Sequence, residues 1–406
     1  MNDFITELRA FLDANWDPEM RVREWWALVA DSGLSKPQWP VEHGGRGLPN
    51  RAETVVRQTF SDYGALPPPG GLGHLMAGPT LLTEGTPEQA ARFLPPILRG
   101  EVGWCQLFSE PGSGSDMAAA TTRAERDGDE FVVTGQKVWT SQAMESDFGM
   151  LLCRTDWDAP KHQGLSWIVL PLDQPGVEVR PLKEMTGRAY FNEVFLDEAR
   201  CSVGDVIGGE GNGWRVAQTT LRFERSGIGP DGTFSMLPHP GIKGGNLERR
   251  AGEALADEPP QPFPRLSVKD LTRLARDRGM SDDPVARQGI AELFAMQRTS
   301  VWTARRARAG GQDTAALASL GKVAGHRYSL KSVAVASRLV GPAGSLAGAD
   351  GLFDGLVTEA ILTSAASRIG GGTDEIQKNV IAERVLGLPK DSLDPSIPFK
   401  DLPRNS

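Results

Sequence analysis

Residues 104–142 read WCQLFSEPGSGSDMAAATTRAERDGDEFVVTGQKVWTSQ and place a glycine loop and a hairpin in one short block. Glycine and serine alternate at residues 112–115, which predicts a turn-rich loop. Backbone N–H groups and hydroxyls in such a loop can hold a phosphate or a polarised carbonyl. Residues typical of strands flank Asp127-Gly128-Asp129, which predicts a β-hairpin.

The same block ends with Trp139 beside two hydroxyl residues, Thr140 and Ser141. An aromatic ring next to hydrogen-bond donors suits a planar cofactor that also forms hydrogen bonds. From spacing alone, a plain hairpin with a glycine loop and a core tryptophan is the commoner explanation, because glycine-rich loops are frequent.

Outward from this block, the chain changes character twice. Residues 1–101 carry apolar side chains at helical spacing, as in Leu8 and Leu12 or Trp25 and Val29. Residues 102–205 hold short runs rich in β-branched and aromatic residues, which predict strands. From residue 206 the helical spacing returns.

Helices, strands and helices in separate blocks predict segregated α+β layers and not alternating βαβ units. No GxGxxG motif follows a first strand, which also argues against a Rossmann fold. We therefore expect an N-terminal helical domain (1–101), a middle β-domain (102–205), a C-terminal helical domain (206–389) and a tail (390–406).

Composition narrows the class of protein. At 406 residues the chain is too long for one core, and its formal net charge of -8 argues against nucleic acid or an anionic membrane as a partner. No run of 18 apolar residues is present, and the start, MNDFITELRAFLDANW, lacks the basic and apolar regions of a signal peptide. Three scattered cysteines and five dispersed histidines predict reduced thiols and no metal site. We expect a cytoplasmic enzyme without membrane insertion.

Two motifs carry a family resemblance. SEPGSGSD followed by GQKVWTSQA, and later IGGGTDEIQKNVIAERVLGLP at 369–389, resemble the two signatures of the acyl-CoA dehydrogenase flavoproteins. The resemblance runs from about residue 1 to 389, apart from a stretch at about 230–265. It implies the three-domain fold with a middle β-domain that resembles a sandwich or barrel and a C-terminal four-helix bundle. It also implies bound FAD and a homotetramer, or a heterotetramer with a paralogous chain.

The implied reaction is α,β-dehydrogenation of an acyl-CoA thioester to the 2-enoyl-CoA, with electrons passed to an acceptor such as electron-transfer flavoprotein. A carboxylate removes the α-proton while the β-hydride passes to flavin N5. The family's common position for this base holds Gly371, which cannot accept a proton. A second arrangement in the family puts the glutamate before an arginine on a helix, and Glu224-Arg225 matches it. We expect Glu224 to be the base and Arg225 to lie in the substrate site, although a surface Glu-Arg pair on a helix is ordinary.

The resemblance also implies the residues around the cofactor. Ser115 is expected to contact the substrate as well as the cofactor. In the family, a neighbouring subunit holds the adenine half of the FAD. Ser337, Gly341 and Arg278 match those positions only loosely. The expected cofactor residues are Gln106, Phe108, Ser109, Gly114, Ser115, Trp139, Ser141, Ser337, Gly341, Thr373 and Glu375.

Residues 230–265 hold seven prolines and five glycines, which exclude a long helix. We expect an extended loop over the substrate mouth, a partly disordered segment, or a solvent-exposed insertion with no role.

Two other functions stay open. The chain could be a non-catalytic partner subunit of a heteromeric acyl-CoA dehydrogenase, or a flavin-dependent monooxygenase of the same fold. The acyl group is not determined by the sequence.

Overall fold

The computed structural model describes residues 2–227, 239–257, 264–308, 314–390 and 396–402. The chain forms two compact units. The first comprises Met1–Leu182, Ala189–Pro259 and Asp394–Ser406, and the second comprises Lys183–Arg188 and Pro260–Leu393. The sequence predicted a boundary at residue 206, but helix α6 (Gly213–Gly227) belongs to the first unit because it packs against that unit's helices and strands.

The first unit begins with a helical layer whose apolar faces are those that the sequence predicted. Leu8, Leu12, Trp25 and Trp26 are fully buried and share one core cluster with Phe60. The helices of this layer are α1 (Asn2–Asn15), α2 (Val22–Asp31), α3 (Arg51–Tyr63), a π-helical turn (Gly73–Ala77), α4 (Gly78–Glu84) and α5 (Pro87–Leu98).

Much of the Pro/Gly-rich insertion packs against this helical layer. Residues 230–238 and 258–263 lie outside the described residues, but 239–257 are described and include the short helix α7 (Ala251–Leu255). Leu247, Ala251 and Ala254 are buried in the core cluster of α1, α2 and α3. The N–H of Val22 donates to the carbonyl of Arg249 at 2.9 Å. The expectation of a solvent-exposed insertion is therefore wrong for 239–257, because these apolar side chains complete a core.

A mixed sheet forms the middle of the first unit. The hairpin predicted around Asp127 is confirmed, with Arg123 opposite Thr134 and Asp127 opposite Glu130. Neighbouring strands follow the order β6-β7-β3-β2-β4-β5-β8, and β1 pairs with β4 in parallel. The strands are β1 (Trp104–Leu107), β2 (Arg123–Asp127), β3 (Glu130–Ser141), β4 (Phe148–Arg154), β5 (Leu165–Pro171), β6 (Val177–Leu182), β7 (Phe191–Ser202) and β8 (Val206–Ile207).

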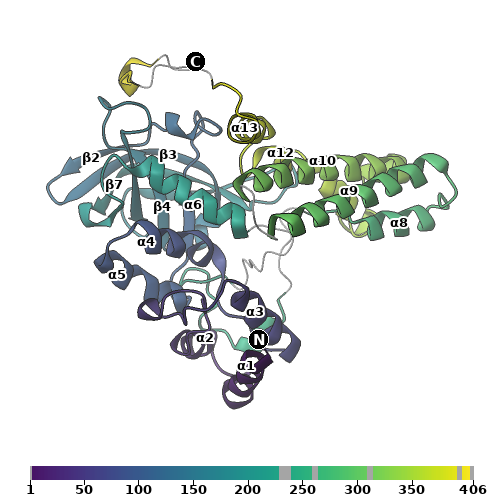
Figure 1. Ribbon diagram of the computed structural model, residues 1–406, viewed down its shortest axis with the longest axis horizontal. Coiled ribbons are helices and arrows are strands. Elements are labelled where there is room, and N and C mark those ends of the chain that lie inside the picture. Colours follow the sequence, from purple (N-terminus) through teal and green to yellow (C-terminus); the bar gives the residue numbers. More distant parts are fainter. Residues whose placement is uncertain (1, 228–238, 258–263, 309–313, 391–395, 403–406) are drawn as a thin grey trace. The chain divides into compact units, whose positions relative to one another are not determined.

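Both faces of the central strands are covered, so alternate residues enter two different cores. Along β4, Met150 and Leu152 join the cluster shared with α4, α5 and α6, whereas Leu151 and Cys153 join a second cluster with β7. Helix α6 runs along the sheet against β5 (Figure 1). A Cβ at Gly213 would lie 2.4 Å from the backbone of Ser166, so only glycine allows this close approach.

The second unit is helical, with the long helices that the sequence predicted. Helices α8, α9 and α10 lie side by side (Figure 1), and together with α11 they enclose one core cluster. Its helices are α8 (Val268–Asp277), α9 (Pro284–Arg308), α10 (Thr314–Val340), α11 (Leu356–Thr363), α12 (Ala366–Ile369) and α13 (Asp374–Val380). Within the described ranges, no helix has the length and apolar character needed to cross a bilayer.

Candidate active site

Glu110 closes the base of the Gly/Ser loop. Its carboxylate accepts the N–H groups of Thr121 at 2.7 Å and Thr122 at 2.9 Å, and it lies 2.8 Å from the ammonium of Lys137. Burial by itself raises the pKa of Glu110, but the Lys137 charge and these hydrogen bonds outweigh burial and hold the pKa at about 2. Residues 110–122 therefore form a loop whose two ends are joined by one ionised carboxylate.

Lys137 connects this loop to the strand that carries Trp139. The ammonium is buried and donates to the carbonyls of Phe108 at 3.1 Å and Leu152 at 2.6 Å as well as to Glu110. All three of its donors thus have an acceptor. Burial lowers the pKa of Lys137, and the Glu110 carboxylate opposes this shift. Nothing in the local sequence pattern marks the pair, because its members lie on different strands or loops and meet only through the sheet.

The tip of the Gly/Ser loop is open. Gly112, Gly114 and Ser115 are exposed, whereas Ser113 is buried and donates its hydroxyl hydrogen to the carbonyl of Asp116 at 2.8 Å. A Cβ added at Gly112 or Gly114 would meet no atom within 4 Å. The packing of the chain itself therefore does not require glycine here, and a glycine backbone leaves room for a ligand to approach the loop.

Trp139 projects from an irregular turn of β3. Its φ is 60°, a left-handed value rare for a bulky residue, and the pairing of β3 with β7 shifts register between Lys137 and Thr140. The N–H of Val138 donates to the carbonyl of Ser109 at 2.9 Å, which joins this turn to the end of β1. The indole is 58% exposed and meets the ring of Phe191 edge-on at 5.7 Å. Such an exposed aromatic surface suits a flat ligand.

The other expected cofactor residues of the first unit lie on the same strands. Ser141 is half-buried at the end of β3 and pairs with Phe191, and Gln106 is half-buried in β1. The ring of Phe108 is buried in the core, so this position can offer a ligand only its backbone. Trp139 and Ser141 thus lie on β3, which pairs with β7, and the hydrogen bond from Val138 joins Ser109 to the same strand.

Glu224 lies on α6, whose C-terminal half is attached to α4. The hydroxyl of Thr80 donates to that of Thr220 at 3.1 Å, and the hydroxyl of Thr219 donates to Glu84 at 2.7 Å. Glu224 follows Thr220 by four residues and shares its face of the helix, and its side chain is half-buried. The side chain of Arg225 lies outside the part of the chain that the structure describes.

In the second unit, the three-glycine turn leads into α13. Gly371 has a φ of 67°, and its carbonyl accepts the side-chain N–H of Gln377 at 3.2 Å. The hydroxyl of Thr373 caps α13 by accepting the N–H of Ile376 at 3.2 Å. Glu375 is exposed and pairs with Arg368 at 2.8 Å, a hydrogen bond that lowers the pKa of Glu375.

Two further observations concern this unit. Ser337 and Gly341 are exposed at the end of α10, and Arg278 is exposed after α8.

His326 Nδ1 lies 2.6 Å from the carboxylate of Asp374, and both side chains are buried. Local sequence pattern does not reveal this His-Asp pair, because the two residues lie on different helices, 48 positions apart in the chain.

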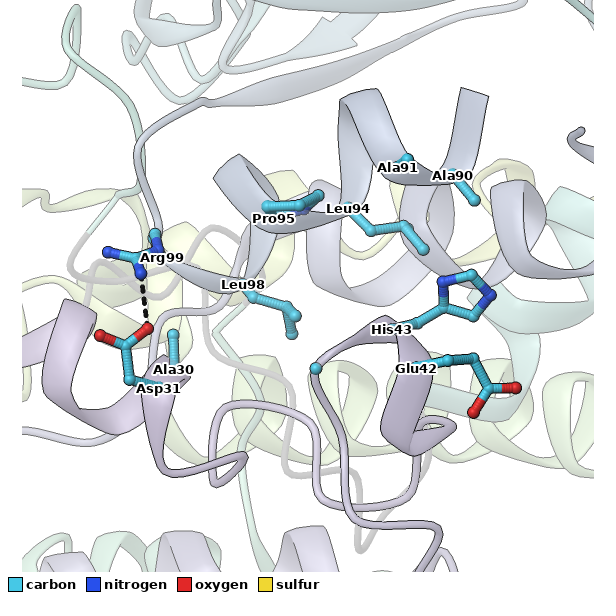
Figure 2. A pocket seen from close by; sticks show the side chains of 11 residues that line it. Ala30, Asp31, Glu42, His43, Ala90, Ala91, Leu94, Pro95, Leu98 and Arg99 are labelled. Carbon is cyan, nitrogen blue, oxygen red and sulfur yellow. Dashed lines mark hydrogen bonds and ion pairs between the residues drawn. The ribbon is translucent and has the colours of Figure 1, made fainter. Parts of the chain in front are cut away.

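A separate hollow of about 210 Å³ lies between the end of α2, residues 42–44 and α5 (Figure 2). Apolar side chains form its floor, and Arg99 paired with Asp31 at 2.5 Å stands at one end. None of the residues predicted for catalysis or cofactor binding lines it. Its lining residues are Ala30, Asp31, Glu42, His43, Gly44, Ala90, Ala91, Leu94, Pro95, Leu98 and Arg99.

Comparison with protein families gives matches over most of the chain. The N-terminal domain model of acyl-CoA dehydrogenase matches residues 1–101, the middle domain model matches 105–199 and the C-terminal domain model matches 271–386. The acyl-CoA dehydrogenase IpdE1 of Mycobacterium tuberculosis is 36% identical over 384 residues, which cover 91% of this chain and 89% of the relative.

Solved structures give matches of similar extent. A steroid ACAD described as Tcur3481-Tcur3483 has a TM-score of 0.70 and 28% identity, covering 96% of this chain and 98% of the other. The ChsE4-ChsE5 complex from Mycobacterium tuberculosis has a TM-score of 0.67 and 25% identity, again covering 96% and 98%.

Proposed function

Because the chain belongs to the acyl-CoA dehydrogenase family, we propose that it catalyses FAD-dependent α,β-dehydrogenation of an acyl-CoA thioester, with Glu224 as the base. The Glu224 carboxylate would accept the α-proton of the thioester, and FAD, when bound, would supply the acceptor for the β-hydride, so that the products would be the 2-enoyl-CoA and a two-electron-reduced cofactor. An acceptor such as electron-transfer flavoprotein would take up these electrons.

The observation that carries this proposal is the half-buried position of Glu224 on α6. A carboxylate held on an ordered helix can accept a proton from a substrate that lies within hydrogen-bond reach. The hydrogen bond of Thr220 to Thr80 orders the turn of α6 before Glu224. At the family's common position for the base, Gly371 offers no side chain.

The first unit offers groups that fit FAD. Trp139 presents an exposed indole, Ser141 supplies a hydroxyl nearby on β3, and Gly114 and Ser115 leave an open, exposed backbone for phosphates. When bound, FAD supplies the acceptor for the hydride. The protein's part is to hold the ring against Trp139 and to place Glu224 for removal of the α-proton. We propose that Thr373 and Glu375 contribute from the C-terminal motif.

Replacement of Glu224 by glutamine tests the proposal. Glutamine keeps the shape and hydrogen bonding of the side chain but cannot accept the proton, so flavin reduction should slow by about 10²- to 10⁴-fold while FAD content stays unchanged. Glu210→Gln is the matched control, since Glu210 forms an exposed pair with Arg126 at 3.0 Å. Stopped-flow bleaching of flavin by acyl-CoA measures both variants. Reduction of Glu224→Gln at the wild-type rate would exclude Glu224 as the base.

A second function is favoured by the structural relatives. Two of them are two-component assemblies, Tcur3481-Tcur3483 and ChsE4-ChsE5, and Gly371 lacks the common carboxylate. The chain would then be a non-catalytic partner whose paralogue supplies the base. Purification of the chain alone separates the two functions: a yellow protein bleached by acyl-CoA supports the first, and a colourless protein that takes up no FAD supports the second.

We propose a steroid-derived acyl-CoA as the substrate class, since one structural relative is described as a steroid ACAD. A screen of thioesters against an artificial electron acceptor tests this choice. Straight-chain, branched and steroid side-chain acyl-CoAs form its three arms. A preference for straight-chain thioesters would contradict the steroid assignment but would remain consistent with the proposed dehydrogenation.

A further inference from the structure

Arg154 supports the far side of the Gly/Ser loop from inside the protein. Its side chain is fully buried at the end of β4. The guanidinium donates to the carbonyls of Ala118 at 2.7 Å and Ala120 at 3.1 Å, just after the loop tip, and to the carbonyl of Lys161 at 3.2 Å. Lys161 in turn pairs with Asp116 at 2.5 Å. Arg154 therefore holds the backbone that follows Gly114 and Ser115.

A segment near the end of the chain covers this arginine. The guanidinium carbon of Arg154 lies 3.4 Å from the centre of the Phe399 ring, and the same ring meets Trp157 at 5.4 Å. The stacking places a desolvated cation on an aromatic face, which is the stronger form of a cation–π contact. Burial also lowers the pKa of Arg154 to about 10, so the ring contacts a cation that has lost much of its water.

Backbone contacts attach the same segment to residues 157–160. The N–H of Phe399 donates to the carbonyl of Ala159 at 3.0 Å, and the N–H of Lys400 donates to the carbonyl of Trp157 at 3.2 Å. Pro398 forms an isolated bridge with Pro160, and the ammonium of Lys400 pairs with Asp158. Residues 396–402 thus lie across the loop that follows β4, with the Phe399 ring turned toward Arg154.

We propose that residues 396–402 act as a strap that fixes the Gly/Ser loop, through Arg154, in the shape that receives a pyrophosphate. This inference rests on the proposed function, which gives the loop that ligand. Pyrophosphate is present in both FAD and acyl-CoA, and the exposed backbone at Gly114 and Ser115 suits either source. Phe399 and Arg154 are positioning residues that act through the loop, because neither side chain lies at the open loop tip.

The test compares Phe399→Leu with Phe399→Tyr in the full-length protein. Leucine keeps apolar bulk but removes the aromatic face, whereas tyrosine keeps it. Phe399→Leu should weaken ligand binding by about 3- to 30-fold, the range expected for loss of a cation–π contact, with the rate of flavin reduction at saturation unchanged. Phe399→Tyr should bind as the wild type does. Glu210→Gln, which removes only an exposed ion pair with Arg126 outside the strap, is the surface control.

Separate measurements identify the source of the pyrophosphate. Titration of the apoprotein with FAD shows whether the loop binds the pyrophosphate of the cofactor. The KM for acyl-CoA shows whether it binds the pyrophosphate of the substrate. Hydrogen exchange of amides 112–122 gives a third readout, which needs no activity and should be faster in Phe399→Leu than in Phe399→Tyr. A wild-type protein inert toward every acyl-CoA would overturn the proposed function but not the strap. Equal exchange and equal ligand binding in the leucine and tyrosine variants would overturn the strap.

Discussion

The ammonium of Lys137 and the carboxylate of Glu110 lie 2.8 Å apart inside the middle β-domain, where both side chains are buried. Lys137 stands two residues before Trp139, and Glu110 closes the Gly/Ser loop. One ion pair therefore sets the relative position of the two features that we propose to hold the flavin ring and the phosphates. Its members are important for the geometry of the site although neither is expected to touch the substrate.

Removal of one partner of this pair should be strongly destabilising. Lys137→Met leaves the Glu110 carboxylate buried without its counterion, and Glu110→Gln leaves the Lys137 ammonium in the same position, so each change should cost about 3–5 kcal/mol. The double variant Lys137→Met/Glu110→Gln should lose less than the sum of the two single changes. Urea unfolding of all four proteins measures this coupling. Additive losses would show that the pair is not coupled.

Acid should destabilise the protein as two ion-paired carboxylates, Glu53 and Glu110, become protonated. Burial raises the pKa of Glu53, but Lys36 and Arg57 outweigh it, so the pKa of Glu53, like that of Glu110, is held at about 2. Both lie below the ordinary value of 4.5, so their stabilising effect is complete above about pH 4.5 and is lost as the pH falls toward 2.

For Glu110, the lowered pKa corresponds to a contribution on the order of 3 kcal/mol to the free energy of unfolding. Melting temperatures measured from about pH 6 to about pH 2.5 would test this loss of stability, because that range runs from above the ordinary pKa of a glutamate to near its lowered pKa in the folded protein. Glu110→Gln should show a shallower acid dependence than the wild type, with the part that belongs to Glu53 remaining. An unchanged slope would contradict the assignment to Glu110.

Trp139→Ala should weaken FAD binding with little effect on the stability of the apoprotein. The indole is 58% exposed, so its loss removes little buried area, and alanine retains the non-glycine backbone at φ 60°. Loss of an aromatic partner should lower FAD affinity by about 3- to 10-fold. Tyr63→Ala, which removes a 40% exposed ring from α3, serves as the control and should leave FAD affinity unchanged. Fluorescence titration of the apoproteins with FAD gives both values.

Gly371→Glu should fold at a modest loss of stability and should partly restore a base. A Cβ at this position would find its nearest atom, Cε of Lys322, at 3.8 Å, so there is room for a side chain. The left-handed φ of 67° costs a non-glycine residue about 1–2 kcal/mol. Gly371→Ala is the control, because it introduces the same backbone strain without a carboxylate.

The two variants are best compared when Gly371→Glu and Gly371→Ala are each combined with Glu224→Gln. Gly371→Glu should regain part of the flavin reduction, and Gly371→Ala should not. If both double variants reduce flavin equally slowly, a carboxylate at residue 371 does not reach the substrate of this protein.

The sequence alone determined the order of helical, β and helical blocks, the hairpin at Asp127 and the family. These features arise from local periodicity, turn residues and contiguous motifs, which need no knowledge of distant contacts. Glu224 was also named from sequence, but only by resemblance, since a Glu-Arg pair on a helix has no pattern of its own. The role of Glu224 stays a prediction.

The tertiary structure decided what residues far apart in the chain do together. Leu247 and Ala251 complete the N-terminal core, although proline and glycine in their segment indicated a loop. The buried charge of Lys137 meets Glu110, and that of Arg154 meets the ring of Phe399, only after the sheet and the end of the chain are in place. Such pairs leave no trace in local spacing, because the free energy that forms them comes from burial and contacts that exist only in the folded chain.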